Sequence, residues 1–336
     1  MLNRITPWLL TITCLFPMLL IAAEEAENKT KLAWTDAAEA PEDFAWQGEF
    51  AGDVKTDDGK QAIGLQLIAR GDGQFEAVSY KGGLPGDGWD GTEQTRVNST
   101  LEDGQILFTH KETGMTATVK QDMMTIAIKN KDGKTVGTLN RVTRKSETLG
   151  AKPPEGAVVL FDGTTGENFE NGRVSKEGFL MQGVTSKQTF KDCHLHVEFM
   201  LPFMPYATGQ QRGNSGCYLQ GRYEVQMLDS FGLAGLDNEC GGIYSVKAPQ
   251  VNMCLPPLTW QTYDIDFTAP VFDEDGNKTK NATLTVRHNG VLVQDHVEVE
   301  GPTRAAPFQE SAEAGPLYLQ DHSNPVRYRN IWLVEK

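Results

Sequence analysis

Clusters of basic residues are missing from this sequence, which carries 31 lysine and arginine residues against 45 aspartate and glutamate residues. Its formal net charge is −14, and no stretch gathers the dense positive charge that binds nucleic-acid phosphates or anionic membrane surfaces. Nucleic acid and membranes are therefore not expected as partners of the mature chain.

Long apolar runs are also rare, and the only one lies at the N-terminus. Residues 1–23 contain a single charge, Arg4, followed by an apolar run over residues 8–23. A helix that spans a membrane needs roughly 20 apolar residues, and this run is shorter and is interrupted by Pro17. The pattern predicts a signal peptide rather than the alternative, a membrane anchor. We expect an exported protein, periplasmic or secreted, that leaves the membrane after cleavage.

Cysteine is scarce, and no CxxC or HxxxH spacing that would indicate a zinc site occurs. Cys193, Cys217, Cys240 and Cys254 follow the signal peptide. An even number of cysteines in an exported protein indicates disulfides. Because Cys240 and Cys254 enclose a glycine-rich loop, we predict a disulfide between them. Four buried free thiols are the alternative.

Amphipathic helices are absent from the N-terminal half. Residues 24–43, rich in Ala, Glu and Lys, predict a flexible leader, and residues 44–144 predict a small β domain of unknown role. Short alternating runs bounded by Gly, Asp and Asn turns indicate an antiparallel meander of six to eight strands, closed or nearly closed into a barrel. The predicted strands are 62–69, 74–80, 105–109, 116–120, 125–129 and 135–139.

A glycine-dense loop over residues 82–91 holds a single tryptophan, Trp89. Such a loop could present Trp89 to a sugar ring. The alternative, which we favour, is that Trp89 packs against the core, because isolated tryptophans are usually packing residues.

The C-terminal half begins after a predicted linker at residues 145–156, which contains Pro153 and Pro154. Residues 157–336 hold many short strands, and this number predicts a two-sheet sandwich of jelly-roll type. The predicted fold class is therefore all-β. The predicted strands are 195–199, 216–220, 223–228, 263–267, 282–288, 317–321 and 328–334.

Residues two apart in a strand share a face, so strand polarity can be read from the sequence. Over residues 223–228, for example, apolar side chains alternate with Glu224 and Gln226. We predict that four strands share one polar face suited to binding sugars, although a solvated sheet surface is the alternative. The predicted face comprises His194, His196, Glu198, Tyr218, Gln220, Glu224, Gln226, Tyr318, Gln320 and His322.

Ordered sequence blocks over residues 158–336 resemble the 3-keto-disaccharide hydrolase family. They include RGNSG at 212–216, YLQGRYEVQ at 218–226, CGGIY at 240–244, GPT at 301–303 and LQDH at 319–322. The resemblance implies a concanavalin-like (laminin-G-like) sandwich that acts on glycosides whose sugar is oxidised at C3. Many relatives carry an aliphatic residue where this chain has Cys217, so a second disulfide to Cys193 is not expected.

The implied chemistry requires a base, because a ketone at C3 acidifies the hydrogen at C2, whose loss can expel the group on C1. Glu224 or His322 is the candidate base. Water addition would complete a net hydrolysis. The candidate oxyanion donors are Gln226, Gln320 and Arg212, and the candidate binders of sugar hydroxyls are Asn214, Tyr218 and Tyr244, with Gln220 and Asp229 as further substrate-binding residues.

Several alternatives stay open. Glu198 and Glu224 could instead hydrolyse the bond directly as a carboxylate pair, which requires a separation of about 5–9.5 Å. A divalent cation held by Glu198, Glu224, Asp229 and His322 is also conceivable, although no cofactor is assured. The domain could also be a lectin-like module that binds glycans without cleaving them, or a structural cell-surface protein.

Overall fold

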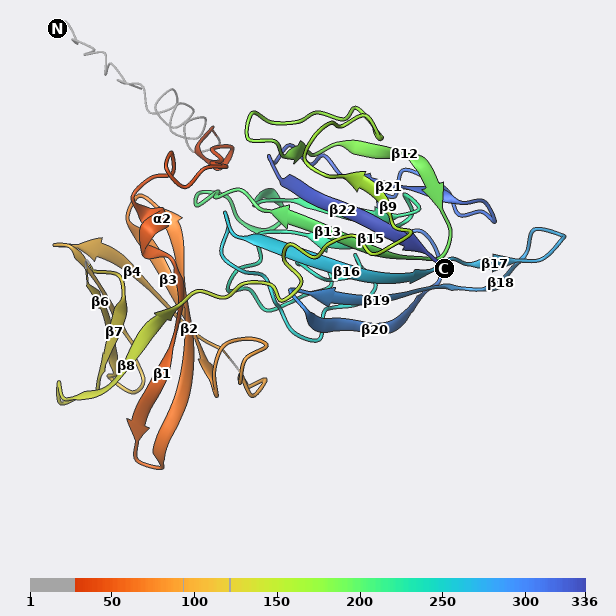
Figure 1. The fold of residues 1–336 in the computed structure, drawn as a ribbon. Helices are drawn as coiled ribbons and strands as arrows, with labels where there is room; N and C mark the ends of the chain where they lie inside the picture. The colour runs from red at the N-terminus through yellow and green to blue at the C-terminus, as the bar shows by residue number, and fades with distance from the viewer. Residues whose placement is uncertain (1–27, 93, 121) are drawn as a thin grey trace, which may run out of the picture.

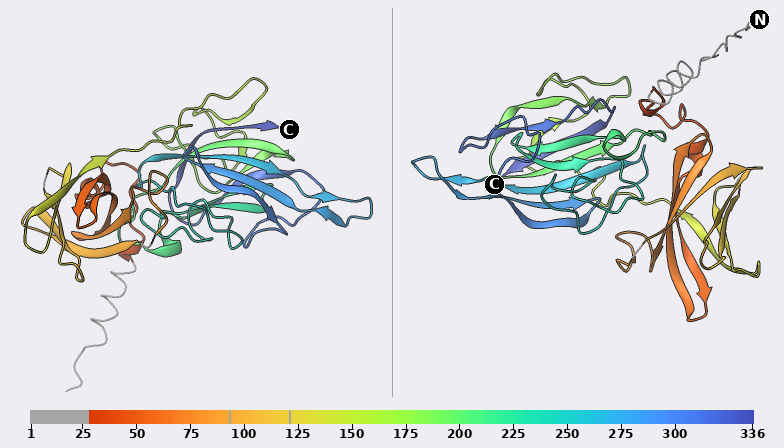
Figure 2. Two further views of the ribbon diagram at one scale, coloured as in Figure 1. Left: turned by 90° about the horizontal axis from the view of Figure 1, so that it is seen from below. Right: turned by 180° about the vertical axis from the view of Figure 1, so that it is seen from behind.

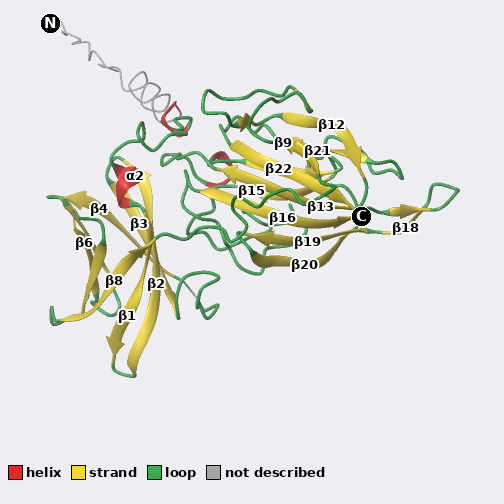
Figure 3. Cartoon of the chain, viewed as in Figure 1, coloured by secondary structure: helices red, strands yellow, loops and turns green. Residues whose placement is uncertain are grey.

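The computed structural model describes residues 28–92, 94–120 and 122–336, so the predicted signal peptide lies outside the described residues. It contains an eight-stranded barrel followed by a two-sheet sandwich (Figure 1), which confirms the predicted all-β class. Almost everything between the strands is loop (Figure 3). None of the helices in the described ranges is long and apolar enough to cross a membrane.

The barrel is antiparallel and closes because β1 pairs with both β2 and β8. Inward residues such as Phe50, Leu67 and Ile126 are fully buried. A short helix precedes β1, and its Trp46 packs against Phe75 inside the barrel with ring centroids 6.4 Å apart. The elements are α2 (Asp43–Trp46), β1 (Gly48–Thr56), β2 (Gly59–Gly71), β3 (Gln74–Lys81), β4 (Thr95–Glu102), β5 (Gln105–Thr109), β6 (Thr116–Lys120), β7 (Thr125–Lys129) and β8 (Thr135–Val142).

The described part of the predicted flexible leader is tied to the sandwich. The backbone of Trp34 exchanges hydrogen bonds with that of Phe203, at 3.0 and 2.9 Å, and the two rings are in contact. This part of the predicted leader is therefore held by contacts with folded residues, among them Lys29 with Asp72 in the barrel.

The sandwich consists of a five-stranded sheet, in the order β10-β12-β21-β14-β15, and a larger sheet, in the order β11-β22-β13-β16-β19-β20 with β9 paired to β22. Figure 2 shows the two units from other directions. The strands are β9 (Val158–Phe161), β10 (Phe169–Glu170), β11 (Leu180–Met181), β12 (Val184–Phe190), β13 (Cys193–Met200), β14 (Ser215–Leu219), β15 (Tyr223–Met227), β16 (Trp260–Thr268), β17 (Val271–Phe272), β18 (Lys278–Lys280), β19 (Ala282–His288), β20 (Val291–Val299), β21 (Gly315–Leu319) and β22 (Arg327–Glu335).

The apolar faces of the two sheets form one core. Val225 and Met227 of β15 and Val197 of β13 belong to it and are fully buried. Because side chains alternate, this leaves Glu224 and Gln226 on the opposite face of the five-stranded sheet.

The prediction that four strands share a polar face is wrong for one of them. β14, β15 and β21 are neighbours in the five-stranded sheet, whereas β13, with His194, His196 and Glu198, is an inner strand of the other sheet. Alternation identifies the polar face of each strand but does not identify the sheet that the strand joins.

All four cysteines after the signal peptide are free and buried, so the predicted disulfide between Cys240 and Cys254 is not present. Other contacts fix the two thiols instead. The hydroxyl group of Tyr263 lies 3.2 Å from Cys240 Sγ, and Cys254 Sγ donates to the carbonyl of Leu228 at 3.5 Å. The glycine-rich loop is therefore held by hydrogen bonds rather than by a covalent link.

Trp89 packs edge-on against Tyr80, with ring centroids 5.4 Å apart, and its indole nitrogen donates to the carbonyl of Thr92. Tyr80 in turn belongs to a cluster in which Ile68 and Val78 of the barrel contact Phe231 of the sandwich. The packing interpretation of Trp89 therefore fits the structure better than sugar presentation.

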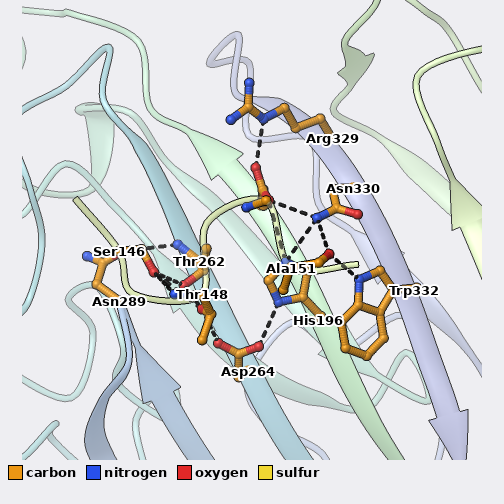
Figure 4. Close-up of polar contacts among 12 residues, drawn as sticks. Ser146, Thr148, Ala151, His196, Thr262, Asp264, Asn289, Arg329, Asn330 and Trp332 are labelled. Atoms are coloured by element: carbon orange, nitrogen blue, oxygen red, sulfur yellow. Dashed lines mark hydrogen bonds and ion pairs between the residues drawn. The ribbon is translucent and has the colours of Figure 1, made fainter. Parts of the chain in front are cut away.

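The segment that joins the barrel to the sandwich lies against the outer face of the larger sheet (Figure 4). The hydroxyl of Thr148 donates to Asp264 at 2.6 Å, and the amide of Gly150 donates to Glu198 at 2.6 Å. His196 lies between the two carboxylates, 2.6 Å from Asp264, and stacks on Trp332. The polar residues of β13 thus serve to hold this connecting segment.

The pH dependence of stability tests this network. Burial opposes ionisation of Glu198, but hydrogen bonds from His196, Asn330, Arg329 and Gly150 outweigh it and lower its pKa to about 2. Between pH 4.5 and about 2, Glu198 is ionised in the folded protein but protonated in the unfolded chain. Its contribution to the free energy of unfolding is therefore present above pH 4.5 and is lost as the pH falls toward 2. In urea titrations, the free energy of unfolding of wild type should fall by on the order of 2 kcal/mol more than that of Glu198→Gln between pH 5 and pH 2.5. Equal losses would contradict this account.

Candidate functional site

Three neighbouring strands of the five-stranded sheet build a polar cavity of about 90 Å³. β14 contributes Tyr218, β15 contributes Glu224 and Gln226, and the residues after β21 contribute Gln320 and His322. The sequence predicted these five residues together with Asn214 and Tyr244. The cavity is lined by Gln210, Asn214, Tyr218, Glu224, Gln226, Tyr244, Arg304, Ala305, Gln320 and His322.

Glu224 is the buried carboxyl group of the cavity, with 2% of the residue exposed. The hydroxyl of Tyr218, directly opposite on β14, donates to Glu224 Oε2 at 2.7 Å, and Gln320 Nε2 donates to the same hydroxyl at 3.2 Å. Gly216 makes room for the carboxyl, since a Cβ atom there would lie 2.2 Å from Glu224 Oε1. A larger residue at this position would displace the carboxyl.

Burial raises the pKa of Glu224 to about 8, although the hydrogen bond from Tyr218 acts in the opposite direction. Burial also raises the pKa of Tyr218, so its hydroxyl stays protonated as a donor. A carboxyl group that titrates near neutral pH is suited to proton transfer, because catalytic acids and bases work best when their pKa is near the operating pH.

Two buried amide oxygens in the cavity wall, Gln226 Oε1 and Asn214 Oδ1, have no hydrogen-bond partner among the described residues. Their amide nitrogens are occupied, because both donate to Gln210 Oε1, at 3.1 and 3.3 Å. Buried acceptors are rarely left unsatisfied in folded proteins, and each of these two oxygens can accept a hydrogen bond from a hydroxyl donor.

A loop after β20 forms part of the cavity wall through Arg304 and Ala305. Thr303 ties this loop to β15, because the amide of Glu224 donates to its hydroxyl at 3.0 Å, and the hydroxyl donates to the carbonyl of Arg222. Sequence reasoning missed Arg304 and Gln210. The GPT block at 301–303, which immediately precedes Arg304, is the signal that could have indicated this loop.

Three predicted substrate-binding residues do not line the cavity. Arg212 and Asp229 form a buried ion pair of 2.6 Å, because a buried guanidinium needs a carboxylate. Gln220 lies in the turn between β14 and β15, where its side chain donates to the carbonyl of Phe190 and accepts from Arg222. All three side chains act within the scaffold.

Glu198 also lies away from the cavity, in the network under the connecting segment. It therefore does not form the alternative carboxylate pair with Glu224. In the described ranges no three His, Cys, Asp or Glu side chains gather closely enough to hold a metal ion, and Glu198 and Asp229 are separated from the cavity that holds Glu224 and His322.

The fold and this cavity define a class of protein, a β-sandwich with a polar cavity on one of its sheets. Residues 156–334 match the model of the 3-keto-alpha-glucoside-1,2-lyase-like domain family. The chain belongs to this family, which confirms the resemblance found in the sequence. The barrel lies outside the matched residues.

Two solved structures from Parabacteroides distasonis, both described only provisionally as glycosyl hydrolases, are similar to part of the chain. One has 36% sequence identity and a TM-score of 0.49, and the alignment covers 55% of this chain and 85% of that one. The other has 18% identity and a TM-score of 0.40, with 58% and 98% covered. No curated protein matches the chain.

The pKa of Glu224 makes a further prediction about stability. Between pH 4.5 and about 8 the folded protein holds a proton on Glu224 that the unfolded chain releases, so this group stabilises the fold at low pH and the contribution is lost as the pH rises through 8. Glu224→Gln removes that dependence. In urea denaturation, the free energy of unfolding of the variant should rise relative to that of wild type by on the order of 2–5 kcal/mol between pH 5 and pH 8. If the difference in free energy of unfolding between variant and wild type did not change with pH, the carboxyl would not be buried as described.

Proposed function

We propose that this chain cleaves the glycosidic bond of 3-keto-glycosides, 3-keto-disaccharides among them, by removal of the C2 proton, elimination and hydration. The observation that carries the proposal is the Glu224 carboxyl, buried in the wall of a polar cavity with a pKa of about 8. The family description supports the same chemistry, because it names a 3-keto-alpha-glucoside-1,2-lyase-like domain. Because its pKa is raised, the ionised form of this carboxyl is a stronger base than an ordinary carboxylate.

In the first step Glu224 takes the proton from C2, and the electron pair of that bond moves toward the C3 ketone to form an enolate. The hydroxyl of Tyr218, which donates to Glu224, orients the carboxylate before the transfer. Gln320 shares this hydrogen-bond chain and has a second amide hydrogen for the enolate oxygen.

Arg304 adds the positive charge that the developing enolate needs. Its side chain lines the cavity and is exposed at the rim. We propose that it approaches the C3 oxygen when sugar is bound, in the role that sequence reasoning gave to Arg212. A positive charge close to an oxyanion stabilises the transition state more than the neutral ketone.

In the second step the enolate expels the group on C1, which leaves with its bonding electron pair and receives a proton. His322, exposed at the rim, is the proposed donor of that proton. Water then adds to C1 of the unsaturated product while C2 regains a proton, so the balance is one glycoside and one water converted to a 3-keto sugar and a free alcohol. The unpaired oxygens of Gln226 and Asn214 would accept hydrogen bonds from sugar hydroxyls.

The proposed site of action is outside the cytoplasm, because the N-terminal sequence predicts a signal peptide. An exported enzyme of this kind would meet its oxidised sugar in the periplasm or the medium.

The activity test uses a 3-keto-disaccharide in deuterated water, with the non-oxidised disaccharide as the substrate control. Wild type should release a product labelled with deuterium at C2, and Glu224→Gln should lower kcat/KM by about 10²–10⁴, the usual contribution of a general base. Glu198→Gln is the matched control and should keep activity near wild type at neutral pH. Product formed without label, or full activity in Glu224→Gln, would refute the mechanism, and binding without turnover would indicate a lectin-like module.

The pH profile tests whether Glu224 is the titrating base. Since only the carboxylate accepts a proton, kcat/KM of wild type should rise with pH and level off above about 8. Tyr218→Phe removes the hydrogen bond that favours the carboxylate, so its midpoint should move to higher pH, with the largest loss of activity at pH 7 and partial recovery above pH 9. An unchanged midpoint would assign the titration to another group, with His322→Ala as the next variant to test.

A further inference from the structure

The N-terminal barrel encloses a second cavity, separate from the site on the sandwich. Its volume is about 270 Å³. Eight-stranded barrels have an interior that side chains just fill or that holds one small ligand. The inward residues of this barrel include several small ones, among them Ala77 and Ala117, and these leave the space open.

The cavity opens at one end of the barrel, and its wall is also parted between β4 and β5, which pair only through Leu101 with Ile106 and Glu102 with Gln105. At the opposite end the helix α2 lies across the strands, and its Trp46 is 2% exposed and packs inside the barrel. Figure 2 (left) shows the strands as a ring with α2 within it. The residues at the mouth come from the end of β1, the start of β4 and the start of β6, namely Thr56, Thr95 and Thr116. The interior of the barrel is therefore closed like a cup at the α2 end, and it opens at the mouth and between β4 and β5.

The lining changes from apolar in the depth of the cup to polar at its mouth. The deep wall is aliphatic and aromatic, with Leu65, Phe108 and Leu139. Hydroxyl, amide and imidazole groups lie toward the mouth, and none of the residues that line the cavity is a lysine, arginine, aspartate or glutamate. The polar residues of the wall are Thr56, Gln61, Ser79, Thr95, His110, Thr113 and Thr116.

The volume limits the size of an occupant. An apolar cavity of about 150 Å³ accepts benzene, with its six carbons, so by proportion 270 Å³ accepts about 11 non-hydrogen atoms. A wall without formal charges does not compensate the desolvation of an ion, so a charged molecule would bind poorly. A sugar ring would also lose hydrogen bonds against the aliphatic depth of the cup.

We propose that the barrel is a binding site for a neutral, mostly apolar small molecule of about this size, such as a bicyclic aromatic or terpenoid compound with one hydroxyl or carbonyl group. The apolar body enters between Leu65, Phe108 and Leu139, and the polar group stays at the mouth among the hydroxyls and His110. The proposal does not depend on the activity of the sandwich domain.

The test titrates the full mature chain with 2-naphthol, a neutral bicyclic phenol, and follows the ligand's fluorescence and the heat of binding. We expect a Kd on the order of 10–100 µM for an uncharged ligand of this size. Naphthalene-2-sulfonate has the same rings but a full negative charge, and it should bind at least tenfold more weakly. Absence of binding by 2-naphthol, or equal binding of both compounds, would overturn the proposal.

Two matched variants locate the bound molecule. Ala117 lines the cavity on β6, whereas Ala127 on β7 alternates with the inward Ile126 and Ile128 and points to the outside of the barrel. Ala117→Phe should fill the cavity and weaken 2-naphthol binding at least tenfold, and Ala127→Phe should leave it unchanged. Circular dichroism checks the folding of both, and Ala77→Leu replaces Ala117→Phe if the latter does not fold. Binding that a folded cavity-filling variant leaves intact would place the ligand elsewhere and refute the proposal.

Discussion

A carboxyl group buried in a β-sheet with one side-chain hydrogen bond is the constraint on which the sandwich site depends. Burial of Glu224 disfavours its ionised form, and the hydroxyl of Tyr218 offsets only part of that effect. The surrounding residues are arranged for this group. Gly216 provides the space for it, and Thr303 fixes the backbone of β15 beneath it. The environment of one side chain therefore determines both its reactivity and the residues that can surround it.

Both faces of β15 are buried, although its sequence alternates like that of a strand with one face in water. All five residues of the strand, Tyr223–Met227, are buried. The apolar side chains meet the other sheet, and the polar ones lie beneath the loops that carry Arg304 and Tyr244. Buried polar groups need partners, so the amide nitrogen of Gln226 donates to Gln210, whereas its amide oxygen has no partner among the described residues. A polar face that is shielded in this way differs from a solvated sheet surface.

Much of this site could be predicted from the sequence, because alternation along β14, β15 and β21 assigns Tyr218, Glu224 and Gln320 to polar faces. The same rule failed for Glu198, since the period of a strand carries no information about which sheet the strand joins. It could not foresee that Arg212 and Asp229 form a buried ion pair at the ends of the β14–β15 hairpin, because neither residue lies within a strand. Arg304 and Gln210 lie on loops, where no period exists. The barrel was predicted as a meander that is closed or nearly closed, and in the structure β1 pairs with β8, at opposite ends of the domain, to close it.

The placement of α2 across one end of the barrel also has a kinetic consequence. Because α2 closes one end, a bound molecule would enter and leave at the opposite end or through the gap between β4 and β5. Its residence time would then depend on the segments around these openings, above all the β1–β2 turn, β4 and the connection between β5 and β6. Substitutions in these segments would change the association and dissociation rates of the ligand, while the residues that line the cavity would still determine its affinity.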